Sequence, residues 1–274
     1  MGENNSHNLQ TEGIVMTEGK KYIKTGIPGF DKLFKHGIPE GSPVVIAGGA
    51  GSGKTIFCLQ LLAQQAAQGK KCYYMSFEEN SDKLIEHMKD FGWDPDKLIK
   101  SGNLKIKRFL TSEIYYYDKD KSKNIEAMMT KEVDPLIMDL EPLTLTDEAG
   151  FKPDFIVIDS LTAISSTFLG KEQSYRFYIE RLFRFFEKVG STNFLVTETK
   201  QLPEVFSPTG VEEFLADGVI VFYNIRQKNN RETAIEVLKM RGEKHEKKVV
   251  AMQITDKGIV VHPDQEVFGA TNIK

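Results

Sequence analysis

A glycine-rich stretch, residues 48–55, has the residue types and spacing needed to hold phosphate groups. It reads Gly-Gly-Ala-Gly-Ser-Gly-Lys-Thr and matches the pattern G-x-x-x-x-G-K-[ST]. Glycines let backbone N–H groups turn inward around phosphate oxygens, and a helix that begins here points its positive dipole end at them. Lys54 supplies a charge to the β- and γ-phosphates, and the Thr55 hydroxyl is a ligand for Mg²⁺. We therefore predict a site for ATP and Mg²⁺ made by Gly49, Ala50, Gly51, Ser52, Gly53, Lys54, Thr55 and Ile56.

Three carboxylates follow apolar runs that read as strands. Asp159 ends the run 155–159, and beside a phosphate loop such an aspartate holds the magnesium shell. Glu78 and Glu79 follow the run 72–77, whose carboxyl end faces the ligand crevice of an open α/β sheet. A carboxylate there can orient a water for attack on the γ-phosphate, so Glu78 and Glu79 join Lys54 as candidate catalytic residues. Adjacent residues point to opposite sides, so one of the pair is the base and the other serves the metal shell or an ion pair. A pair of solvated acids at a helix entry is the alternative.

The surrounding pattern predicts the elements that position these residues. Apolar, β-branched runs predict strands at 44–47, 72–77, 104–110, 155–159, 194–197, 219–223, 233–239, 249–254 and 259–261. Apolar stripes predict helices at 56–68, 82–91 and 175–189, with Ser81 as an N-cap and Gly69 and Gly190 as stops. Strands that alternate with helices and then give way to hairpins predict an α/β fold. Its mostly parallel, twisted sheet is flanked by helices and has antiparallel C-terminal strands.

The chain reads as one domain with two short extensions. Residues 1–20 are polar and aperiodic, which predicts a flexible N-terminal segment; residues 21–267 form the domain, and 268–274 form a tail. Within the domain, 111–152 is the least regular part, with one possible helix at 125–131, and we interpret it as a long excursion.

Composition excludes several classes of protein. The 274 residues are 40% hydrophobic and 27% charged, which excludes wholesale disorder, and the net charge of −3 gives no basic footprint for nucleic acid. No apolar run approaches the roughly 18–20 residues that cross a bilayer, and the first 15 residues lack the features of a secretory signal. The two cysteines, Cys58 and Cys72, lie in apolar runs and read as reduced thiols. We expect a cytoplasmic protein with no membrane partner and no nucleic-acid partner.

Several motifs in order resemble the KaiC family, a branch of the RecA-like P-loop ATPases. Besides the phosphate loop they are TGIPGFDKLFKHGIPEGSPVVIAGG at 25–49, SFEE at 76–79, FGWD at 91–94, VIDS at 157–160, GVEEFLADGV at 210–219 and KMRGEKH at 239–245. The resemblance spans residues 22–267, and the chain has one such domain, so it looks like the single-domain archaeal and bacterial relatives.

The resemblance implies a hexameric ring with ATP held between neighbouring subunits. The phosphate loop, Glu78, Glu79 and Asp159 would act from one side. Residues of the neighbouring subunit would reach the same nucleotide, namely Lys239, Met240, Arg241 and His245. A cation delivered by the neighbour stabilises charge on the transferring phosphoryl group. Without the resemblance, this segment reads as a solvated basic hairpin.

Two positions depart from the family pattern. Glu243 stands where relatives often carry a small hydroxyl residue, and Glu198-Thr199 reverses the Thr-Glu order usual in the clock proteins. The resemblance also permits autophosphorylation, but the available hydroxyls match no phosphosite pattern; they are Ser165, Ser166, Thr167, Ser207 and Thr209.

The function that this pattern favours is an oligomeric ATPase whose ATP state controls its conformation or the binding of an unidentified protein partner. One alternative is a RecA/RadA-like DNA-dependent ATPase, which needs basic and aromatic channel loops. The corresponding segment, 201–214, is acidic and argues against it. The other alternative is a nucleotide-binding regulatory scaffold with little turnover, against which the intact Glu78-Glu79 pair speaks.

Overall fold

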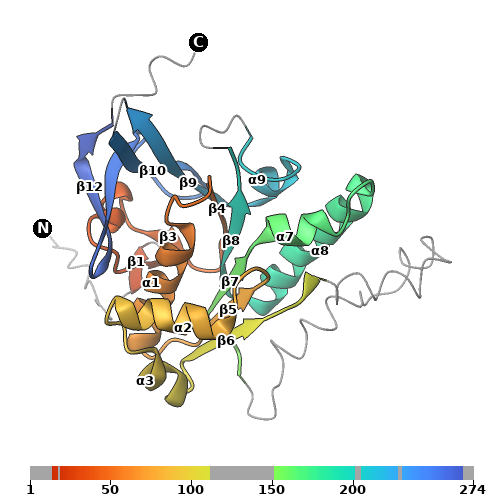
Figure 1. Ribbon diagram of the computed structural model, residues 1–274, viewed down its shortest axis with the longest axis horizontal. Helices are drawn as coiled ribbons and strands as arrows, with labels where there is room; N and C mark the ends of the chain where they lie inside the picture. Colours follow the sequence, from red (N-terminus) through yellow and green to blue (C-terminus); the bar gives the residue numbers. More distant parts are fainter. Residues whose placement is uncertain (1–13, 18, 112–150, 201–204, 228–229, 268–274) are drawn as a thin grey trace, which may run out of the picture.

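A mixed β-sheet forms the centre of the molecule. The computed structural model describes residues 14–17, 19–111, 151–200, 205–227 and 230–267 (Figure 1). Within these residues the main sheet has nine strands, which lie in the order β12 (Gly258–Glu266), β11 (Val250–Thr255), β10 (Asn230–Met240), β9 (Gly218–Gln227), β4 (Pro43–Gly48), β8 (Thr192–Glu198), β7 (Phe155–Asp159), β5 (Cys72–Ser76) and β6 (Leu104–Arg108). The strands from β9 to β6 run parallel, and β10, β11 and β12 are antiparallel. The predicted fold class is confirmed.

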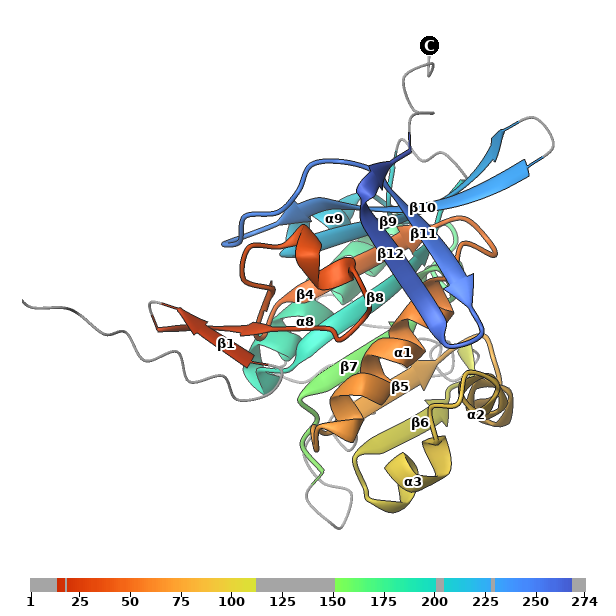
Figure 2. The same cartoon turned by 90° about the vertical axis from the view of Figure 1, so that its left-hand side faces the viewer.

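The parallel strands are apolar because helices cover both of their faces. Every residue of β4 and β7 is buried, and β4 lies between β8 and β9 in register, with Ile46 opposite Val196 and Ile220. One face carries α1 (Lys54–Ala67), α2 (Ser81–Asp90) and α3 (Pro95–Lys100), and the other carries α7 (Leu161–Ser166) and α8 (Glu172–Val189), as Figures 1 and 2 show. Two hydrophobic layers therefore hold the carboxyl ends of the parallel strands in place.

Helix α1 anchors the loop that precedes it. Its Phe57 packs edge-on between Phe30 and Phe222, with ring centroids 5.0 Å and 5.2 Å apart. Such pairs add roughly 0.5–1.5 kcal/mol beyond the area that they bury. The start of α1 thus packs against both η1 (Phe30–Leu33) and strand β9.

Three short helices do not appear among the sequence predictions. In α3, Asp94 caps the helix by accepting from the Lys97 N–H, and in α7 Ser160 does the same for Ala163. The third is α9 (Val211–Leu215). Helices of five or six residues are too short to show a 3.6-residue apolar period, so caps rather than periodicity mark them. The N-cap of α2 is Asn80 and not Ser81, and the helix predicted at 125–131 lies outside the described residues.

A small antiparallel sheet precedes β4. It consists of β1 (Ile14–Thr17), β2 (Lys20–Ile23) and β3 (Ile38–Pro39), and the 3₁₀ helix η1 (Phe30–Leu33) lies between β2 and β3. The sequence patterns predicted no strand within residues 1–20, whereas Ile14–Thr17 form β1. Gly19, at φ 80°, allows the turn that pairs Ile14–Thr17 with Lys20–Ile23 in a local hairpin.

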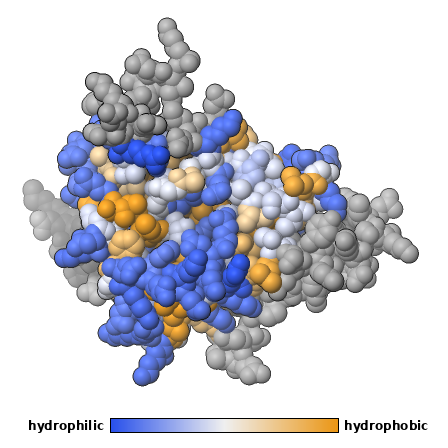
Figure 3. Space-filling model, in the orientation of Figure 1, coloured by the Kyte–Doolittle hydropathy of each residue, from blue (hydrophilic) through white to orange (hydrophobic). Residues whose placement is uncertain are grey.

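The outer helices carry polar surfaces. Helix α2 buries only Leu84 and Met88, and Figure 3 shows the hydrophilic surface that this side of the molecule presents. In the part of the chain that the structure describes, no helix has both the length and the apolar character needed to span a membrane.

Candidate functional site

The glycine-rich loop connects the carboxyl end of β4 to the first turn of α1. Gly51 and Gly53 adopt φ values of 70° and 99°, in the left-handed region that favours glycine. A Cβ atom on Gly48 would lie 2.6 Å from the Phe222 carbonyl oxygen and 2.8 Å from Ser52 Oγ. Ser52 is buried, and its Oγ has no hydrogen-bond partner among the described residues. An orphaned hydroxyl in a loop of this shape fits a polar ligand such as phosphate.

Lys54 lies inside this loop. Its Nζ donates to the Gly49 carbonyl oxygen at 3.0 Å, and the residue is only 7% exposed. Burial lowers the pKa of Lys54, while the nearby carboxylates of Glu198, Asp159 and Glu78 oppose that shift. A buried ammonium with one carbonyl partner retains donors for an anion, so phosphate oxygens would offset its lost hydration.

Asp159 receives two hydroxyl donors on a single oxygen. Thr55 Oγ1 donates to Asp159 Oδ2 at 2.9 Å, and the Tyr74 hydroxyl donates to the same atom at 2.5 Å. Burial raises the pKa of Asp159, and these two hydrogen bonds oppose the rise. Among the described residues, no group of three or more His, Cys, Asp or Glu side chains can hold a metal ion. The Thr55–Asp159 pair nevertheless suits Mg²⁺, which takes one or two protein oxygens together with phosphates and water.

Glu78 and Glu79 have different surroundings. The Ser160 hydroxyl donates to Glu78 Oε1, and the Glu78 charge acts on the pKa values of Lys54 and Asp159. The Glu79 side chain is 41% exposed, with Oε2 4.0 Å from Nδ1 of His87. The structure therefore brings Glu78, and not Glu79, into the charged cluster with Lys54 and Asp159.

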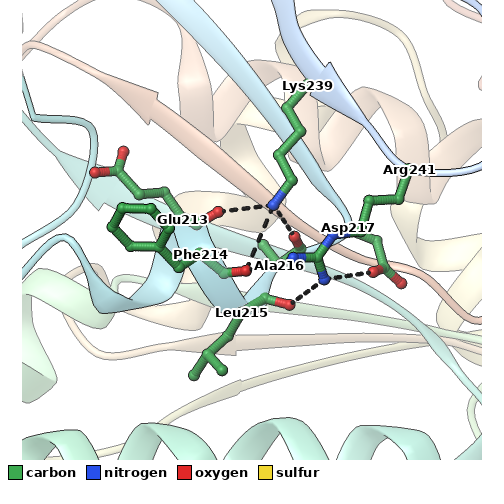
Figure 4. Close-up of polar contacts among 7 residues, drawn as sticks. All are labelled: Glu213, Phe214, Leu215, Ala216, Asp217, Lys239 and Arg241. Atoms are coloured by element: carbon green, nitrogen blue, oxygen red, sulfur yellow. Dashed lines mark hydrogen bonds and ion pairs between the residues drawn. The ribbon is translucent and has the colours of Figure 1, made fainter.

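Lys239 and Arg241 bind the carboxyl end of α9 in the same chain (Figure 4). Lys239 Nζ donates to the carbonyl oxygens of Ala216 at 2.7 Å, Glu213 at 3.0 Å and Phe214 at 3.5 Å. Arg241 donates to the carbonyls of Phe214 and Leu215 and to the carboxylate of Asp217. Cations at a helix carboxyl end satisfy carbonyls that have no partner within the helix. Burial lowers the pKa of Lys239, with the charge of Arg241 as the second cause.

The segment that holds these cations lies at the amino end of the parallel strands, opposite the end that carries the phosphate loop. At the start of β4, Val44 is level with Gly218 of β9 and Met240 of β10. At the end of β4, where the phosphate loop begins, Gly48 is level with Phe222 of β9 and Ile235 of β10. Five residues of strand separate Ile235 from Met240, about 17 Å at roughly 3.3 Å per residue. The segment 239–245 is thus held away from the phosphate loop of its own chain.

The side chain of Met240 and the ring nitrogens of His245 are buried at the amino end of the parallel strands. Met240 is 5% exposed and packs against Gly218, and both ring nitrogens of His245 are buried with no partner in the described residues. Glu243, the departure from the family pattern, accepts from the backbone N–H of His36 and contacts its ring Nδ1 at 3.0 Å. These contacts hold the turn after β10 against His36, which lies between η1 and β3.

Two contacts at the site have no counterpart in the sequence predictions. Ser160 bonds Glu78, and Tyr74 bonds Asp159. Ser160 directly follows Asp159 and has no role assigned from the sequence, and Tyr74 lies within the apolar run of β5, where its type suggests only a core residue. The candidate phosphosites are engaged locally: Ser165, Ser166 and Thr167 each donate to the carbonyl three residues earlier.

Comparison with known proteins agrees with this geometry. The family model described as "ATPase: KaiC" matches residues 23–266. The chain belongs to the KaiC family. A UPF0273 protein of Thermotoga maritima is 31% identical over 245 residues, which are 89% of this chain and 97% of that protein. The circadian clock protein KaiC3 of Synechocystis is 33% identical over 250 residues, 90% of this chain but 46% of the relative, so the chain spans about half of that protein.

A solved structure shows the same fold. The crystal structure of a KaiC-like protein from Pyrococcus horikoshii matches with a TM-score of 0.70 and 30% identity, over 88% of this chain and 99% of that one. The resemblance to the KaiC family stated from the sequence motifs is thereby confirmed, as is the similarity to its single-domain members.

Proposed function

We propose that the protein binds and hydrolyses ATP with Mg²⁺ at the loop 48–55. The observation that carries this proposal is the convergence of Lys54, the Thr55–Asp159 pair and Glu78 at the carboxyl ends of three strands. In this scheme the backbone of residues 49–56 cradles the phosphates and Lys54 balances their charge. Thr55 and Asp159 hold Mg²⁺, which neutralises charge that develops on the phosphate oxygens.

Glu78 is the proposed general base. Its carboxylate lies with Asp159 and Lys54, and Ser160 fixes one of its oxygens, which leaves the other to orient a water for attack on the γ-phosphate. Glu79 is turned toward His87, and we assign it a smaller electrostatic role.

We further propose a ring of identical subunits, hexameric as in the family resemblance, with the nucleotide between neighbours. Lys239 and Arg241 lie too far from the loop of their own chain, so they would serve the loop of an adjacent copy. Met240 and His245 would shape the same segment from behind. Residues 21–267 form the repeating domain of this ring, which acts in the cytoplasm. Its ATP state would control its conformation or the binding of a protein partner.

Phosphate release by site variants tests the catalytic assignment. Lys54→Ala removes the charge that holds the phosphates, so both ATP binding and turnover fall to background. Glu78→Gln keeps ATP binding and loses about 100-fold or more in turnover, because a positioned base contributes roughly 10²–10⁴-fold. Glu79→Gln loses less than Glu78→Gln. ATP affinity by calorimetry and phosphate release are measured on each variant.

Lys83→Ala, an exposed substitution on α2, is the matched control and retains wild-type turnover. Turnover equal to wild type in both Lys54→Ala and Glu78→Gln would show that the catalytic assignment is wrong. Tight ATP binding without turnover in the wild-type protein would favour the regulatory scaffold.

A further inference from the structure

The hydroxyl of Tyr74 occupies a place in the site that the phosphate-loop pattern does not include. Tyr74 lies on β5, is fully buried, and donates to Asp159 Oδ2 at 2.5 Å. The sheet register explains this contact. Tyr74 pairs with Val157 on β7, and Asp159 is the next residue along β7 whose side chain leaves the same face of the sheet. Long side chains reach such diagonal neighbours, and tyrosine is long enough to place an oxygen there.

The two hydroxyls leave the other carboxylate oxygen uncommitted. Thr55 Oγ1 and the Tyr74 hydroxyl both bond Oδ2, and Asp159 Oδ1 has no hydrogen bond to any residue that the structure describes. A carboxylate held at one oxygen has a fixed plane, so its second oxygen has a fixed direction. Thr55 is itself a proposed ligand of Mg²⁺, whereas Tyr74 is not a proposed ligand, and its hydroxyl contacts both the Asp159 carboxylate and the Thr55 side chain.

We propose that Tyr74 is a positioning residue that orients Asp159 toward the Mg²⁺ of the bound nucleotide, an inference that rests on the function proposed above. It touches neither nucleotide nor metal and acts through Asp159. Groups that hydrogen-bond the ligands of a metal fix their orientation, and removing such a group typically weakens metal binding about 10–100-fold.

The chain supplies a matched control at the adjacent position. Tyr73 is also buried on β5, on the opposite face of the sheet, and its hydroxyl has no hydrogen-bond partner among the described residues. Tyr73→Phe and Tyr74→Phe therefore remove the same atom from equally buried rings, and only the second removes a contact with Asp159.

Metal binding is measured directly rather than through activity. Mn²⁺ is titrated into each purified protein saturated with ADP, and free Mn²⁺ is followed by electron paramagnetic resonance. We expect Tyr74→Phe to weaken the Mn²⁺ affinity of the ADP complex about tenfold and Tyr73→Phe to leave it unchanged. ADP affinity in EDTA should be the same for both variants and the wild type. In an Asp159→Ala background, Tyr74→Phe should cause no further loss of Mn²⁺ affinity.

Three results would overturn the inference. Equal Mn²⁺ affinity in the two tyrosine variants would show that the hydroxyl does not act on the site. An equal loss of ADP affinity with and without metal would assign Tyr74 a packing role. A wild-type protein whose ADP binding does not depend on metal would remove the proposed function itself, and this outcome is distinguishable because it needs no variant.

Discussion

The charged residues at the two ends of the parallel sheet differ in their burial and in their hydrogen-bond partners. At the carboxyl end, Lys54 and Asp159 are 7% and 8% exposed. Burial lowers the pKa of Lys54 and raises the pKa of Asp159, so it favours the neutral form of each. At the amino end, the cationic groups of Lys239 and Arg241 bond the carbonyls of α9. Lys54 Nζ has one hydrogen-bond partner among the described residues, whereas Lys239 Nζ has three.

The difference indicates what each end requires. A buried ammonium and a Ser52 hydroxyl that has no partner among the described residues are costly unless a ligand supplies oxygens, so the carboxyl end suits the proposed phosphate ligand. Arg241 is half exposed and held on a short helix, so it is presented to whatever lies beside it. In the proposed ring, the carboxyl end of one chain supplies the phosphate loop, and the amino end of the adjacent chain supplies Lys239 and Arg241 to the same nucleotide.

Mixing two inactive variants is the strongest test of the proposal that Arg241 serves the phosphate loop of an adjacent subunit. Arg241→Ala and Lys54→Ala should each lose about 10³-fold in turnover, since a cation delivered in trans is worth roughly 10³–10⁵. Mixed at equal amounts under conditions of subunit exchange, half of the subunits keep Lys54 and half of their neighbours keep Arg241. About a quarter of the interfaces (1/2 × 1/2) are then intact, and phosphate release should recover to about a quarter of the wild-type value.

Lys247→Ala, an exposed change in the same segment, controls for charge and should retain full activity. Native mass spectrometry with ATP and Mg²⁺ confirms that mixed oligomers form. If they form and phosphate release stays at background, Arg241 acts only within its own chain.

Adding a methyl group at Gly48 would damage the carboxyl end alone. The new Cβ would overlap the Phe222 carbonyl oxygen, and overpacking of this kind costs typically 1–3 kcal/mol. We expect Gly48→Ala to weaken ATP binding by about tenfold or more, as measured by calorimetry. Gly41→Ala places an alanine at φ 83° with no atom within 4 Å, so it adds only left-handed strain of about 1 kcal/mol and should bind ATP normally. Equal losses in the two variants would contradict a steric role for Gly48.

The cost of burying Asp159 should be visible in stability without nucleotide. Burial raises its pKa above 3.8 in the folded chain, so the folded state holds the proton more tightly than the unfolded state. The folded chain is therefore stabilised as pH falls through the raised pKa, and destabilised by the ionised carboxylate above it. Asp159→Asn should raise Tm by about 2–4 °C at pH 8, and this gain should shrink as pH falls toward 3.8.

Thermal unfolding in EDTA, read by circular dichroism at several pH values, measures this difference. Glu86→Gln, an exposed change on α2, serves as the control and should leave Tm within about 1 °C of wild type. A lower Tm for Asp159→Asn at every pH would mean that the hydrogen bonds to the carboxylate outweigh its desolvation.

Local signals carried most of the fold. The runs around β4, β7 and β8 predicted buried strands because helices cover both faces, and Gly190, at φ 72°, ends α8 where predicted. Pairing across the chain was not predictable in the same way. Strand β4 pairs with β8 and β9, which are distant from it in the sequence, and no local pattern reports that pairing. The short helices depend on single caps such as Asp94.

The phosphate loop could be identified from the sequence, because such a loop is built from consecutive residues whose backbone freedom and charge follow from residue type. The sequence patterns also indicated that Asp159 ends a strand beside that loop and that Glu78 and Glu79 follow another strand. Three features follow only from the tertiary structure. Glu78 rather than Glu79 lies with Lys54 and Asp159, and Tyr74 reaches Asp159. The segment 239–245 lies at the amino end of the parallel strands, away from the phosphate loop. These facts depend on register between strands distant in sequence, and register is set by packing of the whole sheet.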